Sequence, residues 1–248
     1  MLRRTIVLAA VMACAAPSAA QSPPAPWKGT NLQYFPKDIS RERLTQRMRE
    51  FSFSLGVRCQ HCHAGGNGVS FEGVSFASDD KPAKTTARAM LRMIDQLNDV
   101  TLARLPSRAE PRVVVDCATC HRGVPLPKSL QTTLFELVEV QGAPAAVAKY
   151  RELRGESALG RYNFGEWEIN ELARRLSEAG KTEAAIAMLE MNGEFYPASA
   201  EIDVLVGEQY RRLGNRAMAA QRYRAALVKS PQHPMAKQRL EELEKPPQ

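Results

Sequence analysis

The sequence predicts an all-α protein built from two different helical segments, and three observations support this prediction. Apolar residues in the first half recur at the three- and four-residue spacing of amphipathic helices. The pattern Cys-x-x-Cys-His occurs twice in that half, at residues 59–63 and 117–121. From about residue 142 the chain has no cysteine, is rich in Ala, Leu, Glu and Arg, and shows an internal spacing of 34 residues.

The first twenty residues are predicted to be a secretory signal peptide. Arg3 and Arg4 form its basic start, the apolar run that follows is too short to span a bilayer, and Ala20 ends a small-residue cleavage site. Residues 11–14 also loosely resemble a lipoprotein box, in which Cys14 would be lipidated. We therefore expect an exported, periplasmic protein, with a lipid anchor only if Cys14 is modified.

The two Cys-x-x-Cys-His patterns are attachment motifs for c-type haem. Each cysteine pair would form thioether bonds with the vinyl groups of one haem, and the adjacent histidine would be the proximal iron ligand. A four-cysteine zinc site or a thioredoxin-like redox pair is the alternative, but neither needs a histidine after each pair. The expected residues of two covalently attached haem c groups are Cys59, Cys62, His63, Cys117, Cys120 and His121.

Helical periodicity places one helix before each motif. A linker that contains three prolines precedes the first of these helices. Ser40 is a suitable N-cap for a helix with an apolar stripe that includes Met48, and Gly56 would end this helix three residues before Cys59. A second amphipathic helix is expected at about residues 82–102. A loop would then lead to Cys117.

Pairs of equivalent residues lie 34 positions apart in the second segment, such as Gly180 with Gly214 and Pro197 with Pro231. This period predicts two helix-turn-helix units at about residues 166–199 and 200–233, with a helix before them (143–153) and a capping helix after them (234–243). The pattern resembles the tetratricopeptide repeat, although Asn192 replaces a usual Ala and Asp203 a usual aromatic residue. A plain bundle of helical hairpins is the alternative.

Counting histidines points to methionine as the distal iron ligand. His61 lies between the two thioether positions of its own haem, and His233 lies in the repeat segment. Methionine is the remaining soft ligand, and His/Met ligation raises the reduction potential of a haem. The haem-bearing segment contains three methionines, each of which could instead fill the core: Met48, Met90 and Met93.

Several stretches resemble the multihaem cytochrome subunit of photosynthetic reaction centres and its soluble relatives. They are residues 31–33, 36–39, the helix with Met48, residues 56–59, residues 89–94 with Leu97 and Asn98, and residues 117–123. The resemblance covers residues 31–125 and implies a helix with the distal methionine before each motif. It assigns Met48 to the first haem and Met93 to the second, and leaves Met90 in the core.

The predicted domains are a signal peptide at 1–20, a dihaem cytochrome c domain at 21–141 and a tetratricopeptide-like domain at 142–248. We expect a carrier of single electrons and not an enzyme, which docks to a protein partner through its repeats. The net charge of +7 suits acidic redox partners, and no nucleic-acid motif accompanies it. A dihaem peroxidase and a repeat scaffold with structural haems are the alternatives. Candidate partners for haem propionates are Arg58, Lys84 and Arg122.

Overall fold

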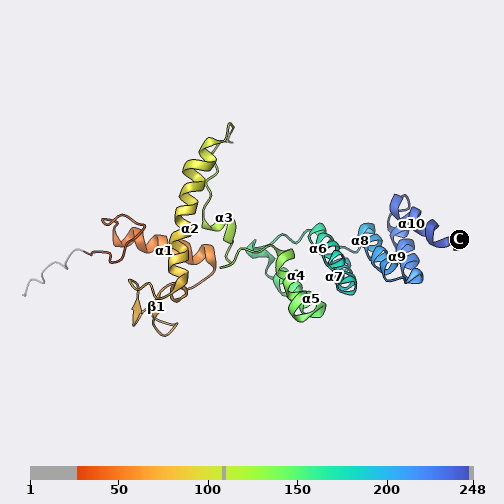
Figure 1. Cartoon of the computed structure of the whole chain (residues 1–248), viewed down its shortest axis with the longest axis horizontal. Coiled ribbons are helices and arrows are strands. Elements are labelled where there is room, and N and C mark those ends of the chain that lie inside the picture. Colours follow the sequence, from red (N-terminus) through yellow and green to blue (C-terminus); the bar gives the residue numbers. More distant parts are fainter. Residues whose placement is uncertain (1–26, 108–109, 246–248) are drawn as a thin grey trace, which may run out of the picture.

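The computed structural model describes residues 27–107 and 110–245, and this part of the chain is almost entirely helical (Figure 1). Its two strands, Ala64–Gly65 (β1) and Val74–Ser75 (β2), form one short antiparallel ladder. The predicted all-α class is therefore confirmed. The predicted signal peptide at residues 1–20, including Cys14, lies outside the described residues.

The helix before the first motif has the predicted ends. Helix α1 spans Arg41–Leu55; the Ser40 hydroxyl accepts a hydrogen bond from the Arg43 amide at 3.2 Å, and Gly56 follows with a left-handed φ of 64°. The first motif then begins with a 3-10 turn at Cys59–His61. Sequence signals at both ends were sufficient here because caps are local features of the chain.

The helix before the second motif changes its winding near the end. Helix α2 spans Pro82–Asp95 and continues as a π-helix at Gln96–Thr101 and a 3-10 turn at Leu102–Arg104, where one helix over 82–102 was predicted. The second motif forms the short helix α3, Cys117–His121. Short π-helical segments are frequent at functional sites.

Helices α1 and α3 meet through two glycines. The Gly123 amide, which follows α3, donates to the Ser54 carbonyl in α1 at 2.8 Å. A side chain on Gly56 would bring its Cβ to 2.1 Å from the Gly123 carbonyl oxygen. Gly56 is thus required twice, for the left-handed end of α1 and for the close approach of the second haem motif.

Seven helices follow in a row, and Figure 1 shows them continuing away from α1–α3. Those of the two predicted units begin 34 residues apart, α6 and α7 matching α8 and α9, and Gly180 and Gly214 turn between them with φ of 75° and 74°. Their bounds are α4 Leu130–Gln141, α5 Ala143–Gly155, α6 Glu166–Glu178, α7 Thr182–Phe195, α8 Ala200–Arg212, α9 Arg216–Lys229 and α10 Pro234–Glu244.

The two residues that depart from the repeat pattern have found polar partners. Asn192 is fully buried and donates to the Glu166 carbonyl at 2.9 Å and to the Asn170 side-chain oxygen at 3.0 Å. Asp203 pairs with Arg222 at 3.3 Å and with Lys229 at 2.7 Å. Each of these two polar side chains therefore connects neighbouring helices through polar contacts. The usual residue of the repeat would connect them by apolar packing.

Helix α4 lies before residue 142 in the sequence but packs with the later helices. Its buried residues Leu130, Leu134 and Val138 belong to the same apolar cluster as Tyr150 of α5 and Leu172 of α6. The Arg175 guanidinium of α6 also lies over the Phe135 ring of α4, 5.0 Å from its centroid. By its packing, α4 is the first helix of the C-terminal row.

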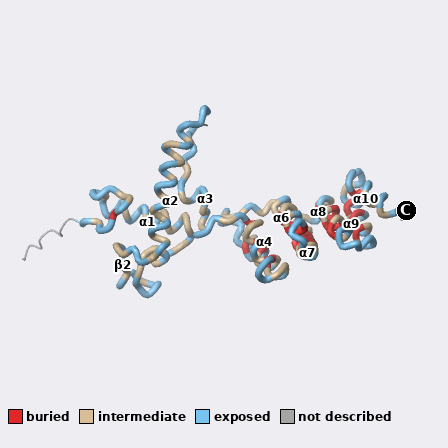
Figure 2. Tube along the Cα trace, viewed as in Figure 1, coloured by how far each residue is buried: buried red, intermediate tan, exposed pale blue. Residues whose placement is uncertain are grey.

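Burial is distributed very unevenly along the chain, as Figure 2 shows. Among the described residues, the buried apolar side chains run from Leu130 to Ala236, with one exception, Leu32. Helices α1, α2 and α3 contain no buried residue. The C-terminal helices therefore have a core of their own, whereas the described protein atoms of the N-terminal part do not form one.

Candidate haem sites

A cavity of about 570 Å³ lies within the N-terminal part, at the first motif. Cys59, Cys62 and His63 of the motif line it, and so does Met48 from α1. Its other walls come from α2 and from residues 27–35, which we call the strap. The cavity is of the size and apolar character expected for a bound cofactor.

The charged residues that line this cavity have a single sign. Among the described residues in its wall none is Asp or Glu, whereas six are cationic: Lys28, Arg41, Arg49, Arg58, Lys84 and Arg88.

Two of these cations are nearly buried and share one carboxylate. The side chains of Lys84 and Arg88 are 12% and 11% exposed, and Asp79 contacts them at 3.2 and 2.9 Å. The hydrogen bond from Arg88, followed by the contacts with Asn31 and Lys84, holds the pKa of Asp79 far below its ordinary range. Asp79 therefore stays charged but balances only one of the two cations, and the remaining positive charge favours an anionic group in the cavity.

His63 is held in an apolar setting at the cavity wall. Its Nδ1 atom is buried without a well-formed hydrogen bond, and its ring meets the Phe76 ring edge-on at 5.1 Å. Burial, followed by the nearby charge of Lys84, lowers the pKa of His63, although the Phe76 carbonyl acts in the opposite direction. A neutral imidazole is the form that binds a metal.

The second motif is oriented by local hydrogen bonds. The Asp116 carboxylate caps α3 by accepting from the Thr119 amide at 2.8 Å. The His121 ring lies 2.9 Å from the Val124 carbonyl through Nδ1, which must therefore be the protonated nitrogen. This tautomer leaves Nε2 as the acceptor, as a histidine that ligates iron requires.

The cysteines of the two motifs differ in exposure. Cys62 and Cys117 are half-buried, and burial raises the pKa of both thiols, whereas Cys120 is exposed. Within the described ranges, no three His, Cys, Asp or Glu side chains gather as a metal site would require. Among the described residues, the four motif cysteines therefore do not gather in one group.

The two methionines of α2 lie on the side of the helix away from the first cavity. Met90 and Met93 are 40% and 46% exposed, and neither is among the residues that line that cavity. Met90, expected in the protein core, is therefore about as exposed as Met93. A core methionine of this chain, Met188, is fully buried.

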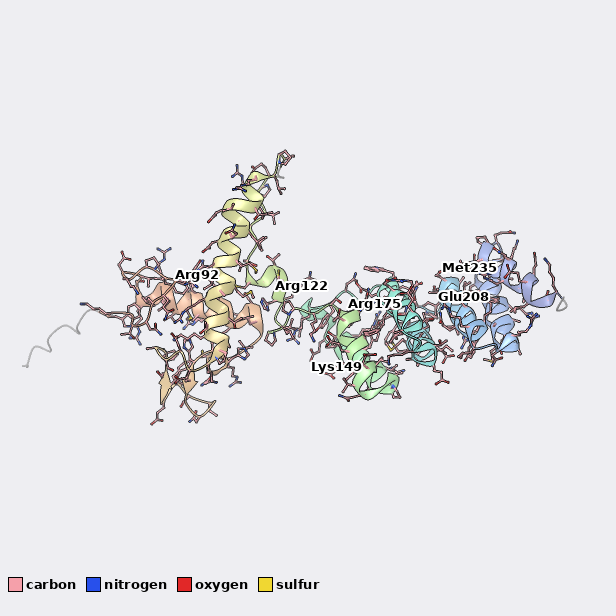
Figure 3. All side chains as sticks on the ribbon, viewed as in Figure 1. Arg92, Arg122, Lys149, Arg175, Glu208 and Met235 are labelled. Atoms are coloured by element: carbon pink, nitrogen blue, oxygen red, sulfur yellow. The ribbon has the colours of Figure 1, made fainter. Side chains whose placement is uncertain are left out.

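The remaining histidines and the predicted propionate partners lie in several parts of the structure. His61 is exposed in the 3-10 turn of the first motif, and His233 caps α10 and contacts Glu201 at 3.2 Å. Arg58 and Lys84 line the first cavity. Arg122 ends α3 with a left-handed φ of 48°, at the junction with the C-terminal helices (Figure 3).

Sequence reasoning missed the cationic residue Arg88 and its partner Asp79. A sequence signal existed for Arg88, which lies four residues after Lys84 on the same face of a predicted helix. The role of Asp79 had no such signal, because its contacts depend on how residues 77–80 fold back onto α2.

The residues present fit haem at the first site. The N-terminal part lacks the core that a segment of this length needs, and it encloses a cavity with apolar walls and excess positive charge. A large planar apolar group with two carboxylates would supply that missing core and balance the charge. The cysteines and the neutral histidine needed to hold such a group lie in the same wall.

Among the described helices, none is long and apolar enough to cross a membrane.

Comparison with known proteins points to cytochromes. Residues 65–160 match the model of the photosynthetic reaction centre cytochrome C subunit, a stretch that includes the second motif and begins just after the first. Cytochrome c-554 of Chloroflexus aurantiacus is 36% identical over 95 residues. That alignment covers 38% of this chain and 20% of the relative, so the chain matches about a fifth of that protein's length. These similarities support a c-type cytochrome related to the reaction-centre subunit.

Proposed function

We propose that this chain is an exported c-type cytochrome that carries single electrons through two covalently attached haems. The observation that carries the proposal is the first cavity, where Met48 faces the same space as Cys59, Cys62 and His63 in a part of the chain with almost no core. The similarity to reaction-centre cytochromes supports the same reading over the second motif.

Each iron would have one histidine and one methionine ligand. His63 and Met48 would hold the first iron, and His121 and Met93 the second. When bound, haem supplies an iron that exchanges one electron between its ferric and ferrous forms. The protein would keep both irons closed to substrate and would favour the ferrous state, since methionine ligation and nearby cations each raise the reduction potential.

The C-terminal helices would form a docking module. Their 34-residue offset and close helix packing support a tetratricopeptide-like array. We place this domain at residues 142–248 by sequence, with α4 packed against it, and the dihaem domain at 21–141. A redox protein in the periplasm would be the partner, and an anchor in the membrane would require lipidation of Cys14.

The replacement of Met48 by His tests the first site. Met48→His should lower the reduction potential of one haem strongly, because His/His haems lie well below His/Met haems, while the thioether bonds stay intact. A redox titration of the matured protein measures this change. An unchanged potential would remove Met48 from the proposed ligands.

The enzyme alternative makes a different demand on the irons. A peroxidase needs one iron with an open position, whereas the proposed carrier has none. Stoichiometric binding of carbon monoxide to the ferrous protein, together with reduction of peroxide, would contradict the carrier and favour the enzyme.

A further inference from the structure

Helix α2 lines the first cavity and also carries Met90 and Met93, the candidate ligands of the second iron. Lys84, Ala87, Arg88 and Leu91 line the first cavity and form one face of the helix. Met93 projects about half a turn away from that face, and Met90 about a third of a turn. The helix that forms one wall of the first cavity is therefore the same helix that would ligate the second iron.

The strap is fastened to α2 along this first face. Arg88 donates to the Asn31 carbonyl at 3.3 Å, and Arg92 donates to the Gln33 carbonyl at 3.4 Å. The best-formed contact is at the end of the helix, where the Tyr34 hydroxyl lies 2.9 Å from both carboxylate oxygens of Asp95. Hydrogen bonds to a charged acceptor are the stronger kind.

Tyr34 itself belongs to the first cavity. It lines the cavity, and its ring packs edge-on against Phe35 at 5.1 Å, while Phe35 stacks on Phe51 of α1 at 6.4 Å. The phenol is thus positioned by aromatic packing at one end and by a carboxylate of α2 at the other.

Asp95 is the last residue of α2, and the contacts continue from there to the second motif. In the π-helix that follows, the Asn98 side chain donates to the Val115 carbonyl at 2.8 Å and accepts from the Val115 amide at 2.9 Å. Val115 directly precedes Asp116, which caps α3. An unbroken chain of contacts therefore runs from the wall of the first cavity to the second Cys-x-x-Cys-His motif.

We propose that Tyr34 is a positioning residue for the second haem, acting from the first cavity through its hydrogen bond to Asp95. This bond fixes the end of α2 that carries Met93, and with it the π-helix whose Asn98 holds the segment before Cys117. The inference rests on the proposed dihaem function and adds a named coupling between the two sites. Tyr34→Phe removes the bond without changing any formal charge.

The test uses matured full-length protein that carries Met48→His, because this change separates the potential of the first haem from that of the second. Redox titration followed by optical and low-temperature EPR spectra then reports each haem separately. Tyr34→Phe should shift the midpoint potential of the second haem and weaken its sulfur-to-iron absorption, and shift the first haem less. Asp95→Ala should shift it too, and the double variant should equal Asp95→Ala alone, because one hydrogen bond is lost in both.

Gln33→Met is the matched control, since Gln33 also lines the cavity and ties the strap to Asp79 at 3.0 Å but does not touch Asp95. It should affect the first haem only. The proposal is overturned if Tyr34→Phe leaves the second haem unchanged, if Gln33→Met shifts it equally, or if the two single effects add. A parent protein without a methionine-ligated second haem would instead overturn the proposed function. If Tyr34→Phe does not mature, the comparison of Asp95→Ala with Gln33→Met decides.

Discussion

Single residues determine which charge the first cavity accepts. Lys84 and Arg88 are nearly buried with one carboxylate, Asp79, between them. Burying a cation without a full counter-charge costs free energy unless an anionic group balances its charge. The propionates of a haem would do so here, and Arg88 would be a stronger partner than the exposed Arg58 because it is already held in place.

Arg88→Gln should lower the reduction potential of the first haem. Loss of a positive charge from the cavity wall stabilises the ferric iron relative to the ferrous iron, so the midpoint potential of the first haem falls. Arg43→Gln is the control, because Arg43 is exposed on α1 and does not line the cavity. Equal shifts in the two variants would show that Arg88 acts only through the overall charge of the protein.

The choice between Met90 and Met93 is also decided at the level of single residues. Met93→Leu should abolish the sulfur-to-iron absorption of the second haem in the oxidised spectrum, because leucine has no atom that can ligate iron. Met90→Leu should leave this band in place. The opposite pattern would assign the second iron to Met90.

Sequence reasoning was strongest for residues whose role is local. The cysteine and histidine spacing predicts each attachment site, and the capping role of Ser40, which the structure confirms, followed from its position before an apolar stripe. It was weakest for contacts between distant segments, such as Tyr34 with Asp95, which lie 61 residues apart. It also placed Met90 in a core, because a methionine on an apolar helix face usually packs there.

Among the elements, the helices of the C-terminal part followed most closely from the sequence. Repetition of the same spacing predicted both helical pairs, α6 with α7 and α8 with α9, before any contact was known. The membership of α4 was not predictable in this way, because it has no counterpart 34 residues later. Its place follows from the apolar residues it contributes to the cluster around Tyr150.

The pair α8 and α9 carries a half-buried carboxylate, Glu208, whose titration should affect stability. Burial raises the pKa of Glu208, but hydrogen bonds from Arg211 and Tyr223 outweigh this and lower it overall. The Tyr223 hydroxyl lies at 2.5 Å, Arg211 at 2.9 Å and Arg239 at 2.9 Å from the carboxylate.

A lowered folded-state pKa stabilises the fold at every pH above the unfolded value of about 4.3, and this contribution is lost as the pH falls below it. Urea unfolding of the C-terminal helices should therefore show stability that declines below about pH 4.3. Glu208→Gln should be less stable than the parent at pH 7 and should decline less steeply in acid. If the free energy of unfolding falls with the same slope against pH in parent and variant, Glu208 is excluded as a source of the decline.

At the scale of the whole molecule, the two parts differ in what stabilises them. The C-terminal helices bury side chains such as Tyr150, Leu172 and Tyr223 completely, whereas α1–α3 bury none. The first part should therefore depend on its haems for folding, and the second should not.

Replacement of all four motif cysteines by Ala tests this division. The variant should retain helical circular dichroism from α4–α10, and limited proteolysis should remove the N-terminal part to leave a stable fragment that begins shortly before Leu130. The haem-loaded parent should resist the same protease. A variant as resistant as the parent throughout would show that the first part folds without haem.

The central claim is that the molecule holds two closed His/Met haems, and an EPR-monitored redox titration of protein matured in the periplasm tests it most directly. We predict two low-spin haems per chain, each with a histidine and a methionine ligand, and two one-electron steps. A single haem, a bis-histidine spectrum or a stoichiometric high-spin iron that binds carbon monoxide would contradict the account.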